Sequence, residues 1–360
     1  MMDDSWEDFK LAARLGHPRQ TPVALIVDSP WLPGYAGIDT RDYFLFQDCW
    51  LKANLDLLQR FPGVVWIPGF WVEYGMAAEP SAFGAKLRFY SDRPPSVEPI
   101  SQDLSLWDGL KPADPHEDGL MPLAIRLYQA ADQRLQAEGL GIKMVAARGP
   151  MTVASWLSGI TPLMLEIAIN PGRVASILDA ATTTIIRWLH AQLDALRDPQ
   201  GILLLDDVVG MVSRKHYERL VWPQLQRIFD EFNGLVRVYH NDTPCMHLVE
   251  SLPKANFDVF NFSHEMDLAE VRARTKNQVA LMGNVPPLEV GVRGTPEETY
   301  QWACRCLQKG GPSGMILSFG GGVSPGAKPE NIDALLRAAC DSAGSGGEEN
   351  GQDRTSSGLI

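Results

Sequence analysis

A histidine and an aspartate with one residue between them, His240 and Asp242, follow the apolar run VRVY in the second half of the chain. In extended backbone, residues i and i+2 point to the same face, so both side chains are expected to project together. An imidazole and a carboxylate can ligate a divalent metal such as zinc, or can act as a base and the acid that orients it. A metal site needs a third ligand, for which Glu73, Asp206 and His264 are the candidates. The simpler alternative is a histidine hydrogen-bonded to a neighbouring aspartate in a polar cleft.

Two consecutive aspartates, Asp206 and Asp207, close the very apolar segment ILLLDD. Neighbouring side chains of a strand point to opposite faces, so only one of the two can face a catalytic cleft. A carboxyl group held near apolar walls has a raised pKa and can act as a general acid, and Asp206 is the candidate for this role. The alternative is that the aspartate caps the segment that runs into Val212 and Ser213.

Eight short apolar runs, most of them ending in a polar residue and followed by a helical pattern, must position these side chains. This order is typical of βα repeats. The predicted strands are residues 24–28, 64–70, 143–148, 202–207, 236–240, 259–263, 279–284 and 315–320. The predicted helices are residues 41–60, 122–139, 171–196, 216–232, 268–276 and 295–309. Eight strands predict an α/β protein with one (β/α)8 TIM-type barrel domain over residues 1–342.

In such a barrel the chemistry lies at the carboxyl ends of the strands, where the loops converge. The polar residues expected there are Asp28, Glu73, Arg148, Asp206, Asp207, His240, Asp242, His264, Asn284 and Ser318. We expect Asp206, His240, Asp242 and His264 to be catalytic, with His240 and Asp242 as metal ligands. We expect Glu73, Arg148, Asn284, Ser318 and Gly321 to bind substrate. Each could instead cap a helix or hydrogen-bond within a loop, and the glycine loop SFGGGVSPG around Gly321 could be a structural turn.

Three segments fall outside the repeat pattern. The residues before the first predicted strand form an N-terminal extension, and the long connection 71–141 after the second contains a predicted small hairpin, FGAKLRFYSD. Connections of this length are often functional lids or insertions. The Gly-, Ser- and acid-rich tail, residues 343–360, has little apolar side chain to bury and is expected to be disordered.

Composition excludes several function classes. A net charge of -12 over 360 residues, without clustered Lys and Arg, argues against a nucleic-acid partner. No apolar run reaches the roughly 20 residues that span a membrane. The five scattered cysteines and the start MMDDSWEDFK, which lacks the pattern of a signal peptide, favour a cytoplasmic location. Both a monomer and a homodimer are compatible with the sequence.

The order of several segments resembles the uroporphyrinogen decarboxylase superfamily from about Arg19 to Ala339. The segments that carry the resemblance are EPSAFGAKL, ARGPMTVASWLSG, LLLDDVVGMVSRKHYERLVWPQLQRI, the H-x-D pair, VALMGNVPP and GGGVSPGAKPENI. The resemblance implies a TIM-type barrel, in agreement with the independent count of strands. Within the superfamily it implies either a decarboxylase or a methyltransferase that works with a corrinoid.

The chain departs from the true decarboxylases at two places. Their arginine-rich N-terminal segment, which holds the propionates of the porphyrinogen, corresponds here to PVALIVDSPWLPGYAG, which has no arginine. They also resemble one another in a histidine of the final glycine loop, where this chain has Gly321. A tetra-acidic pyrrole is therefore not the expected substrate.

Members of the methyltransferase branch resemble one another in a zinc motif, H-x-C, which is completed by a second cysteine in the final loop. His240 matches the histidine, while Asp242 and Gly321 stand where the two cysteines would be. Loss of both thiolates argues against activation of a thiol and favours a harder set of histidine and carboxylate ligands.

A harder, more Lewis-acidic metal would suit the oxygen of a methyl ether. We therefore predict an O-demethylase methyltransferase, which moves a methyl group from a small methoxylated, aromatic substrate to the Co(I) corrinoid (cobalamin) of a separate corrinoid-binding protein. Zinc is the expected metal. Ten tryptophans and thirteen phenylalanines fit an aromatic pocket, although most of them are expected in the core.

Two alternatives remain from the sequence. One is a cofactor-free decarboxylase of a small aromatic or pyrrolic acid, with Asp206 or His264 as the proton donor and Arg148 holding the carboxylate. The other is a partner or chaperone of a corrinoid protein with a vestigial pocket. Metal dependence separates the first alternative from the methyltransferase, and the effect of His240→Ala on turnover separates the second.

Overall fold

The computed structural model describes residues 2–27, 31–72 and 74–345. Asp28 and Glu73, two of the predicted strand-end residues, lie outside the described residues, as do residues 346–360 of the predicted tail. The predicted tail begins at residue 343, whereas the last helix, α14 (Pro329–Ser345), continues to Ser345.

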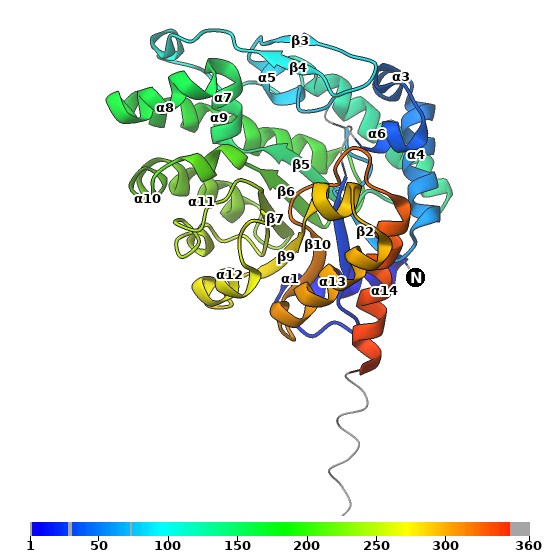
Figure 1. Ribbon diagram of the computed structural model, residues 1–360. Coiled ribbons are helices and arrows are strands. Elements are labelled where there is room, and N and C mark those ends of the chain that lie inside the picture. Colours follow the sequence, from blue (N-terminus) through cyan, green and yellow to red (C-terminus); the bar gives the residue numbers. More distant parts are fainter. Residues whose placement is uncertain (1, 28–30, 73, 346–360) are drawn as a thin grey trace, which may run out of the picture.

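Eight parallel strands form the barrel, and each lies within about two residues of a predicted strand at its start. They are β1 (Val23–Ile26), β2 (Val64–Ile67), β5 (Met144–Arg148), β6 (Gly201–Leu205), β7 (Val236–Asn241), β8 (Val259–Phe262), β9 (Ala280–Val285) and β10 (Met315–Phe319). Their order is β2-β1-β10-β9-β8-β7-β6-β5, so the described strands leave the ladder open between β2 and β5. The predicted (β/α)8 architecture is confirmed as a nearly closed barrel (Figure 1).

Every strand of the barrel is buried on both faces. Alternate residues such as Ile26, Leu203, Val238 and Ile316 fill the interior in one hydrophobic cluster. Their neighbours along each strand pack instead against the surrounding helices in a second, larger cluster. Because both faces are apolar, the strands appear in the sequence as continuous hydrophobic runs, and these runs made the strands predictable.

Helices surround the barrel and follow the predicted ranges with local breaks. The main ones are α4 (Gln47–Arg60), α6 (Met121–Ala137), α9 (Pro171–Asp194), α11 (Trp222–Glu231), α12 (Leu268–Thr275) and α13 (Pro296–Gly310). The predicted helix 41–60 is interrupted at Phe46, which separates α3 (Thr40–Leu45) from α4. The predicted helix 216–232 starts with α10 (Arg214–His216) and the wider turn η3 (Tyr217–Val221). The structure adds α7 (Pro150–Ser158) and α8 (Ile160–Ile169), which the sequence analysis does not separate from the preceding strand and the following helix.

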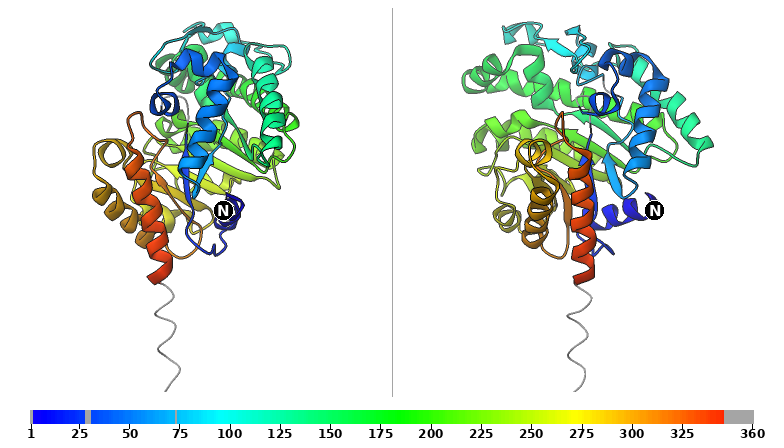
Figure 2. Two further views of the ribbon diagram at one scale, coloured as in Figure 1. Left: turned by 90° about the vertical axis from the view of Figure 1, so that its right-hand side faces the viewer. Right: turned by 45° about the vertical axis from the view of Figure 1, so that its right-hand side comes forward.

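The N-terminal extension forms α1 (Met2–Ala13). Its apolar face, with Trp6, Phe9, Ala12 and Ala13, belongs to the same cluster as the side chains inside the barrel. In both views of Figure 2 the N-terminus and the end of α14 lie at the end of the barrel that is opposite the long insertion. The extension therefore covers the amino ends of the strands and leaves the carboxyl ends free for the site.

The connection between β2 and β5 forms a layer beside the carboxyl ends of the strands, at the top of Figure 1. It contains α5 (Ala78–Ala82), a two-stranded hairpin and the turn η1 (Leu104–Trp107), and it ends with α6. The hairpin pairs β3 (Lys86–Arg88) with β4 (Ser96–Glu98) in antiparallel orientation. Its first strand falls within the predicted segment FGAKLRFYSD, and the second lies just beyond it.

In the described part of the chain, no single helix is long and apolar enough to cross a membrane. The pair α7 and α8 meets the length and composition together, but the two helices are bent by 108° at their junction.

Candidate metal centre at the barrel mouth

The alternation of inward and outward side chains decides between the two consecutive aspartates. In β6, Leu203 and Leu205 point into the barrel interior, while Leu204 packs against the helices. The same alternation sends Asp206 outward and brings Asp207, the first residue of η2 (Asp207–Met211), to the mouth of the barrel. Asp207, which the sequence analysis places at a strand end without a catalytic role, is therefore the aspartate of the site.

Asp206 lies away from the site and holds a helix in place. Its side chain is fully buried, and its carboxylate accepts hydrogen bonds from the backbone amides of Met151 and Thr152 at 3.2 and 2.7 Å and from the Thr152 hydroxyl at 2.8 Å. These donors belong to the first turn of α7, where free amides and the helix dipole favour an anion. Burial raises the pKa of Asp206 to about 7, against the opposing effect of these hydrogen bonds. Asp206, the predicted general acid, therefore stabilises the fold. It caps α7 and not the segment that runs into Ser213.

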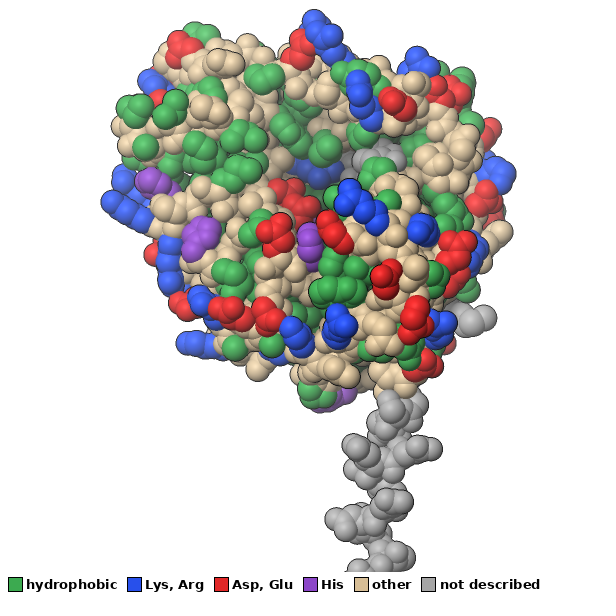
Figure 3. Space-filling view, in the orientation of Figure 1, with side chains coloured by type: hydrophobic (Ala, Val, Ile, Leu, Met, Phe, Trp, Pro, Cys, Tyr) green, Lys and Arg blue, Asp and Glu red, His purple; other side chains and the backbone are tan. Residues whose placement is uncertain are grey.

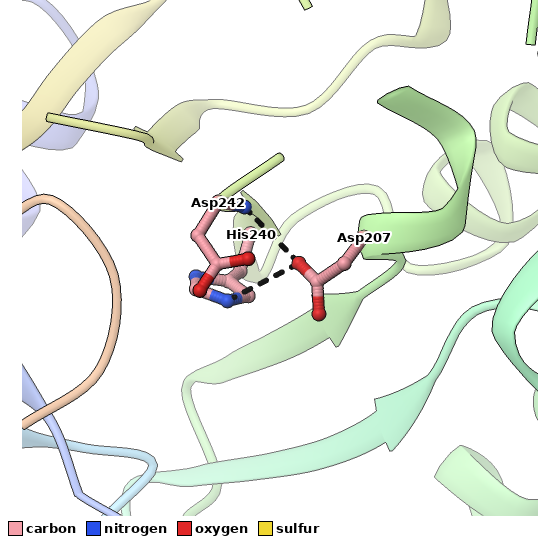
Figure 4. A group of neighbouring side chains, drawn as sticks. All are labelled: Asp207, His240 and Asp242. Atoms are coloured by element: carbon pink, nitrogen blue, oxygen red, sulfur yellow. Dashed lines mark hydrogen bonds and ion pairs between the residues drawn. The ribbon is translucent and has the colours of Figure 1, made fainter. Parts of the chain in front are cut away.

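Three side chains meet at the mouth, as Figure 4 shows: Asp207 follows β6, and His240 and Asp242 come from the end of β7. One ligand atom from each lies within 4.8 Å of the other two. The Nε2 atom of His240 is 3.4 Å from the Oδ1 atom of Asp207, and the backbone amide of Asp242 donates to the same oxygen at 3.1 Å. The predicted pair His240 and Asp242 is brought together, and the third member is Asp207 in place of the three predicted candidates.

Asn261 of β8 sets the orientation of the His240 ring. Its amide nitrogen donates to the carbonyls of Met282 and Phe319 at 2.8 and 3.1 Å, so its oxygen faces the ring. That oxygen is 2.6 Å from Nδ1 of His240, which must therefore carry the proton. In the neutral ring the lone pair is then on Nε2, the atom that points to the two carboxylates. Sequence reasoning missed Asn261; the only signal was a polar residue inside the apolar run VFNF.

The final glycine loop closes one side of the group. Gly321 has a φ of 132°, and a Cβ atom at this position would be 3.3 Å from the Oδ2 atom of Asp242. A side chain here would be strained and would crowd the carboxylate. Partial removal from water, followed by the charge of Asp207, raises the pKa of Asp242 above the usual aspartate range. Such a carboxylate is stabilised by a cation at the same place.

The donor set fits a zinc ion. Two ligands of a tetrahedral zinc, each about 2.1 Å from the metal, lie about 3.4 Å apart. The 3.4 Å between His240 Nε2 and Asp207 Oδ1 matches this separation. One imidazole and two carboxylates leave a fourth position for water or substrate, as in catalytic zinc sites, and oxygen donors make the ion a stronger Lewis acid than thiolates would.

Arg148 and Trp71 form a second wall of the mouth. Arg148 ends β5 with its side chain on the inner face, and its guanidinium carbon lies 4.8 Å from the centre of the Trp71 ring. Its backbone amide donates to the buried Glu79 of α5 at 2.8 Å. Burial raises the pKa of Glu79, and the nearby amide and guanidinium of Arg148 lower it in part. A cation over an aromatic face in a partly closed site can bind a planar, electron-rich molecule.

The remaining predicted residues lie around the group and not in it. His264 is partly exposed, with its Nε2 atom 3.8 Å from the Glu289 carboxylate. Ser318 points inward and is fully buried, and its hydroxyl lacks a hydrogen-bond partner among the described residues. Asn284 points to the outer layer, where its amide donates to the Met266 carbonyl at 2.7 Å. The structure therefore places Ser318 in the interior and His264 at the rim, and it turns Asn284 away from the mouth.

The close approach of Gly149 to Asp206 predicts an effect on stability. A Cβ atom at Gly149 would lie 2.4 Å from the Asp206 carboxylate, which its three hydrogen bonds hold in place. We expect Gly149→Ala to lower the free energy of unfolding by roughly 3 kcal/mol, the upper end of the range for overpacking. Urea denaturation measures this, with Gly172→Ala, whose added methyl group meets only ordinary contacts, as the matched control. Equal midpoints for the two variants would contradict the tight contact.

The hydrogen bond from His240 to Asn261 predicts an effect on metal binding. We expect Asn261→Leu to lower the affinity for zinc by about 10- to 100-fold, because the ring is no longer held in one tautomer. A titration against a competing chelator measures the affinity. In the metal-free protein, ¹⁵N NMR of the imidazole should show one tautomer for the wild type and two for the variant. Unchanged affinity together with one tautomer would show that Asn261 does not orient the ring.

Comparison with known proteins places the chain in a family. The family model described as uroporphyrinogen decarboxylase (URO-D) matches residues 51–341. The uroporphyrinogen decarboxylase of Synechococcus sp. (strain CC9605) is 26% identical over 262 residues, which cover 69% of this chain and 70% of that protein. The methylated-thiol–coenzyme M methyltransferase of Methanosarcina mazei is 23% identical over 293 residues, covering 80% of this chain and 76% of that protein.

A solved structure shares the fold. The structure described as a methyltransferase from Methanosarcina mazei superposes with a TM-score of 0.79 at 19% sequence identity, and the match covers 93% of this chain and 98% of that one. The barrel predicted from the strand count and the family indicated by the motifs are both confirmed. With a family match that spans most of the barrel, the chain belongs to the uroporphyrinogen decarboxylase family.

Proposed function

We propose that the protein is a methyltransferase that moves a methyl group from a methoxylated, aromatic substrate to the Co(I) corrinoid of a partner protein. The observation that carries this proposal is the group Asp207, His240 and Asp242 at the barrel mouth, with ligand atoms within 4.8 Å of one another. A decarboxylase without a cofactor needs no metal ligands. A methyltransferase that must activate a poor leaving group does.

The donor set favours an ether over a thiol as the methyl donor. A thiol is best activated at an electron-rich zinc, whereas the oxygen of a methyl ether needs a stronger Lewis acid. The two positions that the resemblance associates with cysteine hold Asp242 and Gly321, and Asp207 adds a second carboxylate. Loss of both thiolates and gain of an oxygen ligand both make a bound metal a stronger Lewis acid.

Each residue then has a role that its position allows. Asp207, His240 and Asp242 would hold the metal, and Asn261 keeps Nε2 of His240 directed to it. A zinc ion bound there would polarise the ether oxygen. Co(I) of the partner's corrinoid would supply the electron pair for the new bond to the methyl carbon, and the pair of the broken C–O bond would stay on the aryl oxygen, which would leave as a phenolate. His264, partly exposed at the rim, is the group proposed to protonate that oxygen.

The relatives support the reaction class without deciding the substrate. One relative in the comparison is named for methyl transfer to coenzyme M, and several are named as decarboxylases. The decarboxylases favour a second candidate function, a cofactor-free decarboxylase of a small aromatic or pyrrolic acid. Arg148 is the observation on this chain that fits it, because its cation faces the mouth beside the Trp71 ring and could hold a carboxylate.

A corrinoid assay distinguishes the two functions. We expect the protein to convert free or protein-bound Co(I) corrinoid to the methylated form in the presence of one member of a panel of methoxyarenes. The absorption spectrum of the corrinoid measures this conversion. The conversion should stop when the metal is removed by a chelator and return with added zinc. Absence of conversion with a competent corrinoid acceptor, together with metal-independent release of CO2 from an aromatic acid, would favour the decarboxylase.

Variants at the two carboxylates test the proposed metal ligands Asp207, His240 and Asp242, called here the metal group. We expect Asp207→Ala and Asp242→Ala each to reduce bound metal and to lower methyl transfer by at least about 100-fold. Loss of a residue that only orients a metal ligand costs up to about 100-fold, and here a ligand itself is lost. Circular dichroism should show an intact fold. Glu265→Gln changes a carboxylate on the loop after β8 outside the group and should keep full metal and activity. An Asp242→Ala protein with full metal and full turnover would rule out the proposed ligand.

A further inference from the structure

A large groove lies next to the barrel mouth, between the insertion and the helices α3, α4 and α6. Its volume is about 710 Å³, within the range of pockets that bind small molecules. The walls are mostly apolar and aromatic, with Phe44, Leu45, Phe89 and Leu123 among the lining side chains. Figure 3 shows a different face, with a central hollow that has hydrophobic side chains above it and acidic side chains at its lower edge.

The apolar walls are unusually exposed. Leu45 is 71% exposed, Leu123 is 55% exposed and Phe89 is 45% exposed. Large apolar side chains that are scattered singly over a surface need no explanation, but a contiguous group that lines a concave surface marks a binding site. The groove therefore has walls that gain free energy when an apolar molecule covers them.

The charges of the groove have one sign. Arg41 and Arg126 are the charged residues among its described lining, and no acidic side chain lines it there. Arg41 is paired with Asp39, whereas Arg126 donates to the neutral oxygen of Gln129 at 2.9 Å. An exposed guanidinium beside an apolar wall, without an acidic partner among the described residues, is suited to a ligand carboxylate.

A thin partition separates the groove from the barrel mouth. A smaller cavity shares the wall residues Phe44, Gln47, Tyr74 and Leu127 with the groove, and Trp71 lines its other side. The rings of Phe44 and Tyr74 are in contact, with their centres 5.8 Å apart. Trp71 belongs to the cluster of side chains inside the barrel, so the groove and the mouth lie on the two sides of one layer of aromatic rings.

The segment that provides this partition has an uncommon backbone. Tyr74 and Met76 have φ values of 53° and 77°, although neither is a glycine. Residues other than glycine adopt this conformation rarely, and such residues concentrate at ligand clamps and active sites. The strained backbone, the single sign of charge and the exposed apolar walls all occur at the same groove.

We propose that the groove is a binding site for a small anionic aromatic molecule, with its ring against Phe44, Leu123 and Phe89 and its carboxylate on Arg126. Aromatic walls select a planar apolar body, and the Arg126 cation, which has no acidic partner among the described residues, selects a negative group. The site is distinct from the metal group, and it lies on the other side of the Phe44 and Tyr74 rings. Binding there does not depend on the proposed methyl transfer, because it needs neither metal nor corrinoid.

The experiment compares two probes of nearly equal shape, 1-naphthoate and the neutral 1-naphthalenemethanol, by isothermal titration of the metal-free, full-length protein. We expect the carboxylate to bind about tenfold more tightly, the ratio that one charge-assisted hydrogen bond provides. Arg126→Gln should remove this preference. Arg134→Gln, which changes an exposed arginine on the same helix outside the groove, should keep it. Equal binding of both probes, or an equal loss in the two variants, would overturn the proposal.

A second pair of variants tests the apolar wall without disturbing the core. Leu123→Asp places a negative charge in the groove and should abolish binding of 1-naphthoate, whereas Leu165→Asp, at a leucine of α8 that is 59% exposed, should leave it unchanged. Light scattering gives the oligomeric state of each variant. If Leu123→Asp changes the oligomeric state while 1-naphthoate binding persists, the groove is an interface between protein chains and the ligand site is rejected.

Discussion

The two-residue alternation of strands that are buried on both faces is the constraint on which the rest of this structure depends. The interior of the barrel and the layer between barrel and helices are both filled with apolar side chains. A shift of one residue in any strand would exchange these two sets, so the register is strongly specified. The same register brings His240 and Asp207 to the mouth and sends Asp206 to the helix layer.

The adjacent aspartates consequently carry different tasks. Asp206 satisfies amides in the first turn of α7, a helix that begins two residues after Arg148, the last residue of β5. The hydrogen bonds that anchor this helix therefore also fix the backbone beside the mouth. Asp207 is one residue further along and accepts the backbone amide of Asp242, which links the ends of β6 and β7 across the metal group. Structural and chemical roles are thus coupled through one peptide unit.

The mouth has two unlike sides. The side formed by β6, β7 and the final glycine loop presents an imidazole and two carboxylates. The side formed by β2, β5 and the insertion presents Trp71 and Arg148, and the aromatic groove lies beyond a layer of rings on this side. The ladder is open between β2 and β5 in the described strands, and the insertion lies at this seam. The proposed metal ligands and the aromatic, cationic wall would together suit a substrate with a polar reacting end and a planar body, in keeping with the proposed methyl ether.

The sequence by itself determined the barrel, its eight strands, the family and the pair His240 and Asp242, because these follow from local patterns: continuous apolar runs, i, i+2 spacing and recognisable motifs. Only the tertiary structure decided which aspartate joins the pair, since the choice between Asp206 and Asp207 depends on which face of β6 points inward. It also decided the role of Asn261, whose three partners lie on three other strands and leave no trace in local sequence. Contacts between residues far apart in the chain are set by how the strands are arranged around the barrel, and local sequence patterns do not show which side chains that arrangement brings together.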